Sequence, residues 1–241
     1  MITSEIDAVL SLAREDMRAL KAYEHAQWRP ELERLHANES PWPPLSSNDG
    51  LARHHYPEPQ PAELVAAMAK YYGVAADQVL VGRGSDEGID LLTRAFCRAE
   101  QDSVVVCPPT FGMYAVAAAI QGARTVSIPL RENFQLDVTA IVTALQAPSS
   151  RSPKLVWVCS PNNPTGNSLG RSDIQEVIDA ARGRAIVIVD EAYAEFKTHL
   201  NGALRDAHWT WIFDCSGMTL EHYASVNFLR NLVHTLVLEH D

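Results

Sequence analysis

The sequence is poor in lysine and has no cluster of basic residues. Only four of its 241 residues are lysine, and 30 acidic residues outnumber 20 Lys and Arg, so the formal net charge is −10. Nucleic-acid binding depends on clustered Lys and Arg side chains that contact phosphates. The acidic composition therefore argues against nucleic acid as the main partner.

Long apolar runs and closely spaced cysteines are also absent. No apolar stretch approaches the ~20 residues of a membrane helix, and the acidic start MITSEIDAVLSLARED is unlike a signal peptide. The cysteines have no CxxC spacing and no HExxH motif occurs, which argues against a metal site. We therefore expect a soluble, cytoplasmic protein without a metal, in which Cys107 and Cys159 are buried free thiols.

From residue 61 onward, apolar runs alternate with amphipathic segments. The apolar runs predict strands at 78–82, 103–107, 124–130, 154–159 and 185–190. The segments between them predict helices at 61–73, 85–99, 112–121, 137–146 and 172–182. Strands that alternate with helices favour a mostly parallel sheet, and near-continuous apolar strands indicate that helices cover both faces. The predicted fold is therefore a three-layer α/β domain.

In such a fold, ligands bind in the loops at the carboxyl ends of the strands. The loop VGRGSDEG (81–88) precedes a helix whose first N–H groups could hold a phosphate, although a plain capped turn explains it equally well. Phe111, in CPPTFGMY (107–114), could stack on a flat ligand or simply pack. CSPNNPTGN (159–167) is more specific, because its prolines and asparagines predict a rigid loop with amides aimed into the cleft.

The stretch AIVIVDEAY ends its apolar run at Asp190, followed by Tyr193. A carboxylate at the end of a buried strand is costly unless a cation or hydrogen-bond donors pair with it. A protonated pyridine nitrogen is one such cation.

Seven motifs occur in order between about residue 30 and residue 197: HANESP, HYPEPQPAEL, GRGSDEGIDLLTRAF, CPPTFGMY, NFQLD, SPNNPTG and VDEAYAEF. With them the sequence resembles the fold type I pyridoxal-phosphate-dependent aminotransferases, and among these the histidinol-phosphate aminotransferase family. The resemblance implies an incomplete large domain of that fold and the cofactor pyridoxal 5'-phosphate. The implied reaction moves an amino group between L-histidinol phosphate and 2-oxoglutarate, with glutamate as the partner amino acid, in histidine biosynthesis.

The resemblance also implies a role for each matching residue. Asp190 would pair with the pyridinium nitrogen, Phe111 would stack on the ring, and Asn163 and Tyr193 would hydrogen-bond the ring hydroxyl, so that Asp190 and Tyr193 form the catalytic set. The resemblance implies that the cofactor phosphate is held by Gly84, Ser85 and Asp86. It also implies a homodimer in which Tyr56 contacts the partner subunit's cofactor, and it places Asn38 near the substrate.

The sequence departs from the family where the catalytic lysine is expected, near position 220. FDCSGMTLEHY (213–223) contains no lysine, and the only lysines are Lys21, Lys70, Lys154 and Lys197. Lys154 precedes a strand and is expected at the wrong end of the sheet. We therefore divide the chain into a helix and arm (1–50), an incomplete cofactor-binding domain (51–205) and a divergent tail (206–241). The tail either inserts residues 209–214 beside strand 185–190 or packs as a helix and leaves that edge open, and we favour insertion. We expect no turnover.

Two other functions stay open at this stage. The chain could be an aminotransferase for another amino acid, such as an aromatic one, or a related decarboxylase. It could also be a non-catalytic remnant that binds the cofactor or a partner subunit.

Overall fold

The computed structural model describes residues 2–21, 23, 32, 35, 37–43, 54–148 and 152–194. They form two compact units, which we call the sheet unit (described parts of Met1–Ala19 and Gly82–Asp241) and the arm unit (Leu20–Val81). The expected tail strand at 209–214 lies outside the described residues. The boundaries predicted at residues 50 and 205 remain predictions.

The sheet unit contains four parallel strands in the order β2-β1-β3-β4. They span Ser103–Val106 (β1), Arg124–Ser127 (β2), Leu155–Cys159 (β3) and Ile186–Asp190 (β4). The helices are α1 (Ile2–Leu12), α2 (Glu15–Arg18), α4 (Ser85–Phe96), α5 (Met113–Gln121), α6 (Val138–Leu145) and α7 (Arg171–Ala181). The parallel α/β prediction is confirmed, with element ends that differ from the predicted ones by no more than three residues.

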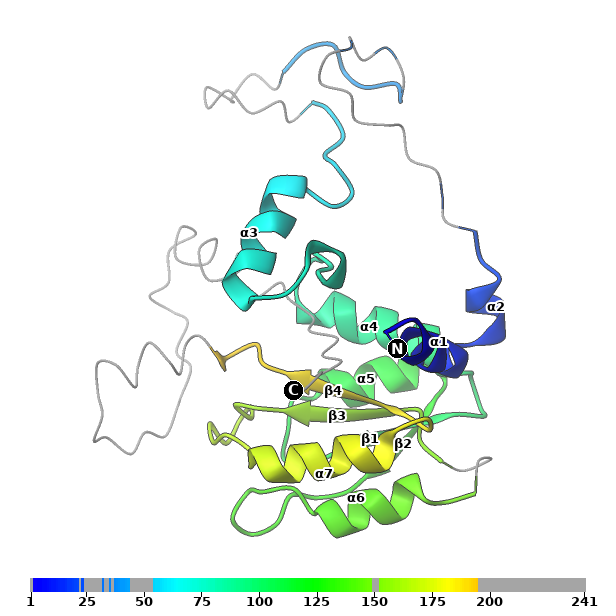
Figure 1. Cartoon of the computed structure of the whole chain (residues 1–241), viewed down its shortest axis with the longest axis vertical. Coiled ribbons are helices and arrows are strands. Elements are labelled where there is room, and N and C mark those ends of the chain that lie inside the picture. The colour runs from blue at the N-terminus through cyan, green and yellow to red at the C-terminus, as the bar shows by residue number, and fades with distance from the viewer. Residues whose placement is uncertain are drawn as a thin grey trace, which may run out of the picture. The chain divides into compact units, whose positions relative to one another are not determined.

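Helices cover both faces of the sheet, as Figure 1 shows, with α4 and α5 on one face and α6 and α7 on the other. Alternate strand residues point to opposite faces. Leu155 and Trp157 pack with α4 and α5, whereas Val156 and Val158 pack with α6 and α7. Burial on both faces explains why the strands are continuous apolar runs, and it fixes the register that brings the loops after the strands to one edge.

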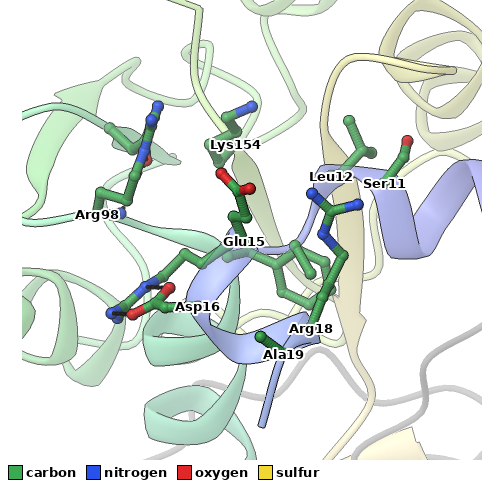
Figure 2. Close-up of a pocket in the computed structure, with 12 residues that line it drawn as sticks. Ser11, Leu12, Glu15, Asp16, Arg18, Ala19, Arg98 and Lys154 are labelled. Carbon is green, nitrogen blue, oxygen red and sulfur yellow. Dashed lines mark hydrogen bonds and ion pairs between the residues drawn. The ribbon is translucent and has the colours of Figure 1, made fainter.

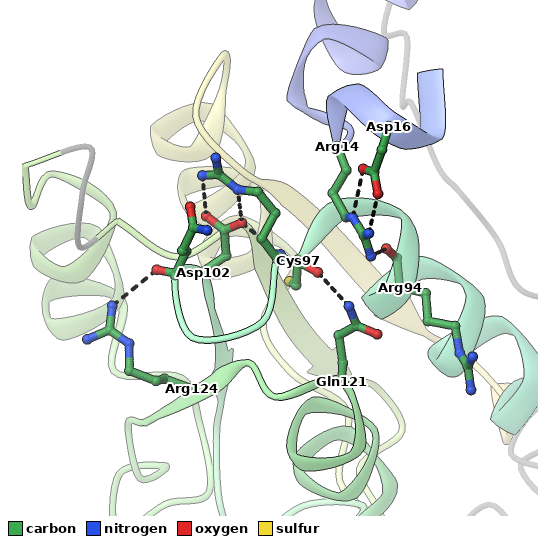
Figure 3. Close-up of polar contacts among 9 residues, drawn as sticks. Arg14, Asp16, Arg94, Cys97, Asp102, Gln121 and Arg124 are labelled. Atoms are coloured by element: carbon green, nitrogen blue, oxygen red, sulfur yellow. Dashed lines mark hydrogen bonds and ion pairs between the residues drawn. The ribbon is translucent and has the colours of Figure 1, made fainter. Parts of the chain in front are cut away.

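The turn between helices α1 and α2 contacts the last turn of α4, near the amino ends of the strands. The backbone N–H of Arg14 donates to the Ala95 carbonyl at 2.9 Å, and the Arg14 guanidinium donates to the Arg94 carbonyl at 2.9 Å. These carbonyls belong to the last turn of α4, where no intrahelical N–H remains to bind them. Figure 3 shows the contact beside the ion pair of Arg14 with Asp16.

The arm unit confirms the helix predicted at 61–73, since α3 spans Ala62–Tyr72 and ends at Gly73 with φ of 69°. The strand predicted at 78–82 is wrong. Residues Ala76–Gln78 form a 3₁₀ turn, and Val81 makes only an isolated bridge. The Gln60 side chain accepts from the Val81 N–H and donates to the Val81 carbonyl, both at 2.8 Å. The Gln60 amide therefore satisfies the backbone groups that would otherwise pair with a neighbouring strand.

Candidate functional site

Asp190 is the last residue of β4, directly opposite Cys159 of β3. The Tyr114 hydroxyl donates to its Oδ2 at 2.6 Å, and the Ala192 N–H donates to its Oδ1 at 3.1 Å. In the described part of the chain, no Lys, Arg or His side chain forms an ion pair with this carboxylate. Asp190 thus has two neutral donors and retains capacity to accept from a cation.

Tyr114 comes from α5 and is fully buried. Its ring stacks on Trp157, with centroids 5.0 Å apart, and meets Phe111 edge-on at 5.7 Å. Burial, and then the charge of Asp190, raises the pKa of Tyr114, so the hydroxyl stays protonated and acts as a donor. Sequence reasoning missed Tyr114; the available signal was its position one helical turn after Phe111.

The loop after β3 is held by Asn162, which is 3% exposed. Its Oδ1 accepts from the Thr110 hydroxyl at 2.9 Å, and its Nδ2 donates to the Pro109 carbonyl at 2.8 Å and to the Thr165 hydroxyl at 2.6 Å. We expected both asparagine amides of this loop to point into the cleft. For Asn162 that expectation is wrong, because its amide is used up within the protein and joins the loops after β1 and β3.

Asn163 and Tyr193 lie close together, as expected for two residues that are predicted to contact the same ring hydroxyl. The Asn163 Nδ2 donates to the Tyr193 hydroxyl over 3.4 Å, and both side chains are partly exposed. Ser160 donates its N–H to the Asp190 carbonyl at 2.9 Å, so the loops after β3 and β4 lie side by side. Asp190, Tyr193 and Asn163 therefore share the carboxyl edge of the sheet, although their roles remain predictions.

The loop before α4 is shaped by Gly84 and Glu87. Gly84 has φ of 92°, a conformation that side chains disfavour, and it immediately precedes the helix. The Glu87 carboxylate accepts from the Arg83 N–H at 2.6 Å and pairs with the Arg83 guanidinium at 2.7 Å, an interaction that lowers the pKa of Glu87. Ser85 and Asp86 form the first turn of α4, whose N–H groups have no acceptor within the helix.

Two predicted site residues belong to the arm unit. Tyr56 is 65% exposed, and its N–H donates to the Glu39 carboxylate at 2.6 Å. Asn38 adopts a positive φ of 53° in the turn before Glu39. Because both lie outside the sheet unit, their part in the site remains a prediction.

A pocket of about 600 Å³ lies at the opposite end of the strands, beside the residues that precede β1 and β3. It is lined by the α1–α2 turn, by residues that precede β1 and by Lys154, which precedes β3, as Figure 2 shows. The expectation that Lys154 sits at the wrong end of the sheet is confirmed. In the same region, Arg98 holds the buried Asp102 carboxylate at 2.8 Å.

Two general properties follow from the described residues. No helix among them is long and apolar enough to cross a membrane, and no three His, Cys, Asp or Glu side chains gather into a metal-binding group there. Cys107 and Cys159 are buried free thiols, as predicted, and burial raises the pKa of Cys107 to about 12.

Comparison with known proteins identifies relatives of the chain. The family model "Aminotransferase class I and II" matches residues 20–220. Histidinol-phosphate aminotransferase 1 of Haemophilus influenzae is 44% identical over 196 residues, which cover 78% of this chain and 53% of the relative. The histidinol-phosphate aminotransferase of Xanthomonas campestris is 45% identical over 200 residues, covering 78% and 52%. The chain thus spans about half the length of these curated relatives.

A solved structure has the same fold. The histidinol-phosphate aminotransferase of Sinorhizobium meliloti, crystallised with pyridoxal-5'-phosphate, superposes with a TM-score of 0.53 at 23% identity. The match covers 58% of this chain and 37% of that protein. At this identity, the likeness supports the fold alone.

Proposed function

Because the chain belongs to the aminotransferase class I and II family, we propose that it is the cofactor-binding part of a histidinol-phosphate aminotransferase. The proposed reaction moves an amino group between L-histidinol phosphate and 2-oxoglutarate, in the cytoplasm and in a homodimer. The observation that carries the proposal is the 44–45% identity to proteins of that name over 78% of this chain.

The donor set at the carboxyl edge of the sheet fits pyridoxal phosphate. Asp190 offers a carboxylate that accepts from Tyr114 and Ala192 but has no cationic partner among the described residues. A pyridinium N–H is a cationic donor of the kind that such a carboxylate takes. Bound pyridoxal phosphate supplies an electron-withdrawing ring that stabilises negative charge on the substrate carbon bearing the amino group.

The protein's own groups have separate tasks in this proposal. Asp190 keeps the ring nitrogen protonated, and Phe111 packs against the ring. Asn163 and Tyr193, which already contact each other, donate to the ring hydroxyl. The phosphate binds at the start of α4, where Gly84, Ser85 and Asp86 present backbone N–H groups and the positive end of the helix dipole. Tyr56 and Asn38 act on the partner's cofactor and on the substrate.

A second candidate is a protein that binds the cofactor without turnover. It is favoured by the absence of lysine from residue 198 to residue 241, which includes the region where the family carries its catalytic lysine. The two candidates share the same binding site and differ only in catalysis.

Ligand binding tests the proposal without requiring turnover. The full chain is titrated with pyridoxal phosphate, and the cofactor absorbance is then followed on addition of L-histidinol phosphate, L-histidinol, L-phenylalanine or L-tyrosine. The proposal expects saturable cofactor binding and a spectral change at the lowest concentration with L-histidinol phosphate. A response to the aromatic amino acids at lower concentrations would favour another aminotransferase, and no cofactor binding would refute both candidates.

A further inference from the structure

Tyr114 contacts two residues of the candidate site and one residue of the sheet beneath it. It touches Asp190 through its hydroxyl, Phe111 through its ring edge and Trp157 through its ring face. Asp190 and Phe111 are the residues proposed to contact the cofactor ring from different directions. Tyr114 therefore connects two proposed contacts without being one itself.

The packing of the Tyr114 ring fixes the place of its hydroxyl oxygen. The Tyr114 ring is completely buried and lies parallel to Trp157, with an interplanar angle of 5°. Phe111 packs edge-on at 84°. A ring fixed by two aromatic neighbours keeps its hydroxyl at one position, 2.6 Å from Asp190 Oδ2. That distance is typical of a hydroxyl that donates to an ionised carboxylate.

The direction of this hydrogen bond has a chemical consequence. Tyr114 donates its hydroxyl proton to Oδ2 and the Ala192 N–H donates to Oδ1, so each carboxylate oxygen of Asp190 has one donor. Each oxygen keeps a further lone pair with which it can accept from a ring N–H. The two donors also fix the plane of the carboxylate, which leaves its remaining lone pairs in set directions.

From this arrangement, we infer that Tyr114 is a positioning residue, which holds the Asp190 carboxylate oriented for the pyridine nitrogen of the cofactor. The inference rests on the proposed function, because it assigns Tyr114 a role toward the same ligand. A purely structural role would instead be to fill space beside Trp157 and to satisfy a polar group.

A pair of ligands separates these roles. Pyridoxal phosphate and its 1-deaza analogue, in which C–H replaces the ring nitrogen, are titrated separately into the full chain. The wild type is expected to bind pyridoxal phosphate about tenfold or more tightly than the analogue, since a charge-assisted hydrogen bond is lost with the nitrogen. Tyr114→Phe keeps the ring but removes the hydroxyl, and we expect it to reduce that preference to about threefold or less.

The readout is the ratio of two affinities measured on one preparation, so it holds even if part of the variant fails to fold. Tyr71→Phe, at a tyrosine that is 65% exposed on α3, is the matched control and should leave the ratio unchanged. If Tyr114→Phe weakens both ligands equally, or neither, Tyr114 is structural and the inference is overturned while the proposed function stands. If the wild type binds neither ligand, the proposed function fails and the inference fails with it.

Discussion

Two acidic residues at opposite ends of the sheet have very different partners. Asp102 precedes β1, and its carboxylate pairs with the Arg98 guanidinium at 2.8 Å while also accepting from the Arg98 N–H at 2.8 Å. Asp190 ends β4, and its carboxylate accepts from two neutral donors of the described chain, Tyr114 and Ala192. Figure 3 shows the first arrangement, at the amino end of the strands.

The difference indicates which end of the sheet is built for a ligand. Burial opposes the ionisation of Asp102, but the hydrogen bonds and charge of Arg98 outweigh burial and lower the pKa of Asp102. That charge is satisfied within the chain. The Asp190 carboxylate is half-buried and has no cationic partner among the described residues, although a cation offsets the cost of removing a carboxylate from water. Among the described residues, Asp102 is thus paired with a cation and Asp190 is not, which points to the carboxyl end of the strands as the place for a cationic ligand.

Catalysis should show the largest effect, because the lysine nearest the described sheet lies at the wrong end. We expect no aminotransferase turnover from the 241-residue chain, since loss of a group that acts in general acid–base chemistry alone costs about 10²–10⁴-fold. A stopped assay with L-histidinol phosphate and 2-oxoglutarate measures this. Continued glutamate formation over many turnovers would contradict the prediction, because it would require a catalytic lysine at the carboxyl end of the strands.

Borohydride reduction gives a second view of the same prediction. Cofactor held without a covalent bond should leave no label on any single lysine after reduction. Specific labelling of Lys154 would contradict its place at the amino end of the sheet, and specific labelling of Lys197, outside the described residues, would identify another catalytic base. Peptide mass spectrometry distinguishes these outcomes.

The polar network at the carboxyl end should matter for stability as well as for binding. Asn162→Ala removes three hydrogen bonds from a buried amide and leaves Thr110, Thr165 and the Pro109 carbonyl without that partner. We expect a loss of about 2–3 kcal/mol in the free energy of unfolding, measured by urea denaturation. Asp16→Ala removes an exposed ion pair at the amino end and should cause no measurable change. Equal losses of unfolding free energy in Asn162→Ala and Asp16→Ala would contradict the difference between the two ends of the sheet.

A smaller, pH-dependent effect is expected at Asp102. Its folded-state pKa is lowered from 3.8, so its contribution is present above the unfolded-state pKa and is lost as pH falls through the folded-state value. Asp102→Asn should cost about 1 kcal/mol at pH 7, since the Arg98 guanidinium is half exposed and solvent weakens the pair. The difference from wild type should shrink as pH falls below 3.8 and vanish below the folded-state pKa, as measured by urea denaturation. A difference that grows in acid would reverse the assigned sign.

The sequence predicted the features that depend on local pattern. The apolar run at 185–190 predicted a strand that ends at Asp190, and β4 spans Ile186–Asp190. The structure adds the Tyr114 and Asn162 contacts, which join residues 76 and 53 positions apart and therefore depend on tertiary packing. The strand predicted at 78–82 failed for the same reason, because apolar alternation does not reveal that Gln60 binds the Val81 backbone groups.

The comparison of Asp190 with Asp102 is tested most directly by measuring the affinity of the full chain for pyridoxal phosphate in two matched variants. Asp190→Asn should weaken binding by about 10–100-fold, because the carboxylate that would pair with the ring nitrogen loses its charge. Asp102→Asn removes the same charge from the other end of the sheet and should leave the affinity unchanged. Equal affinities for Asp190→Asn and the wild type, or an equal loss in both variants, would contradict the account.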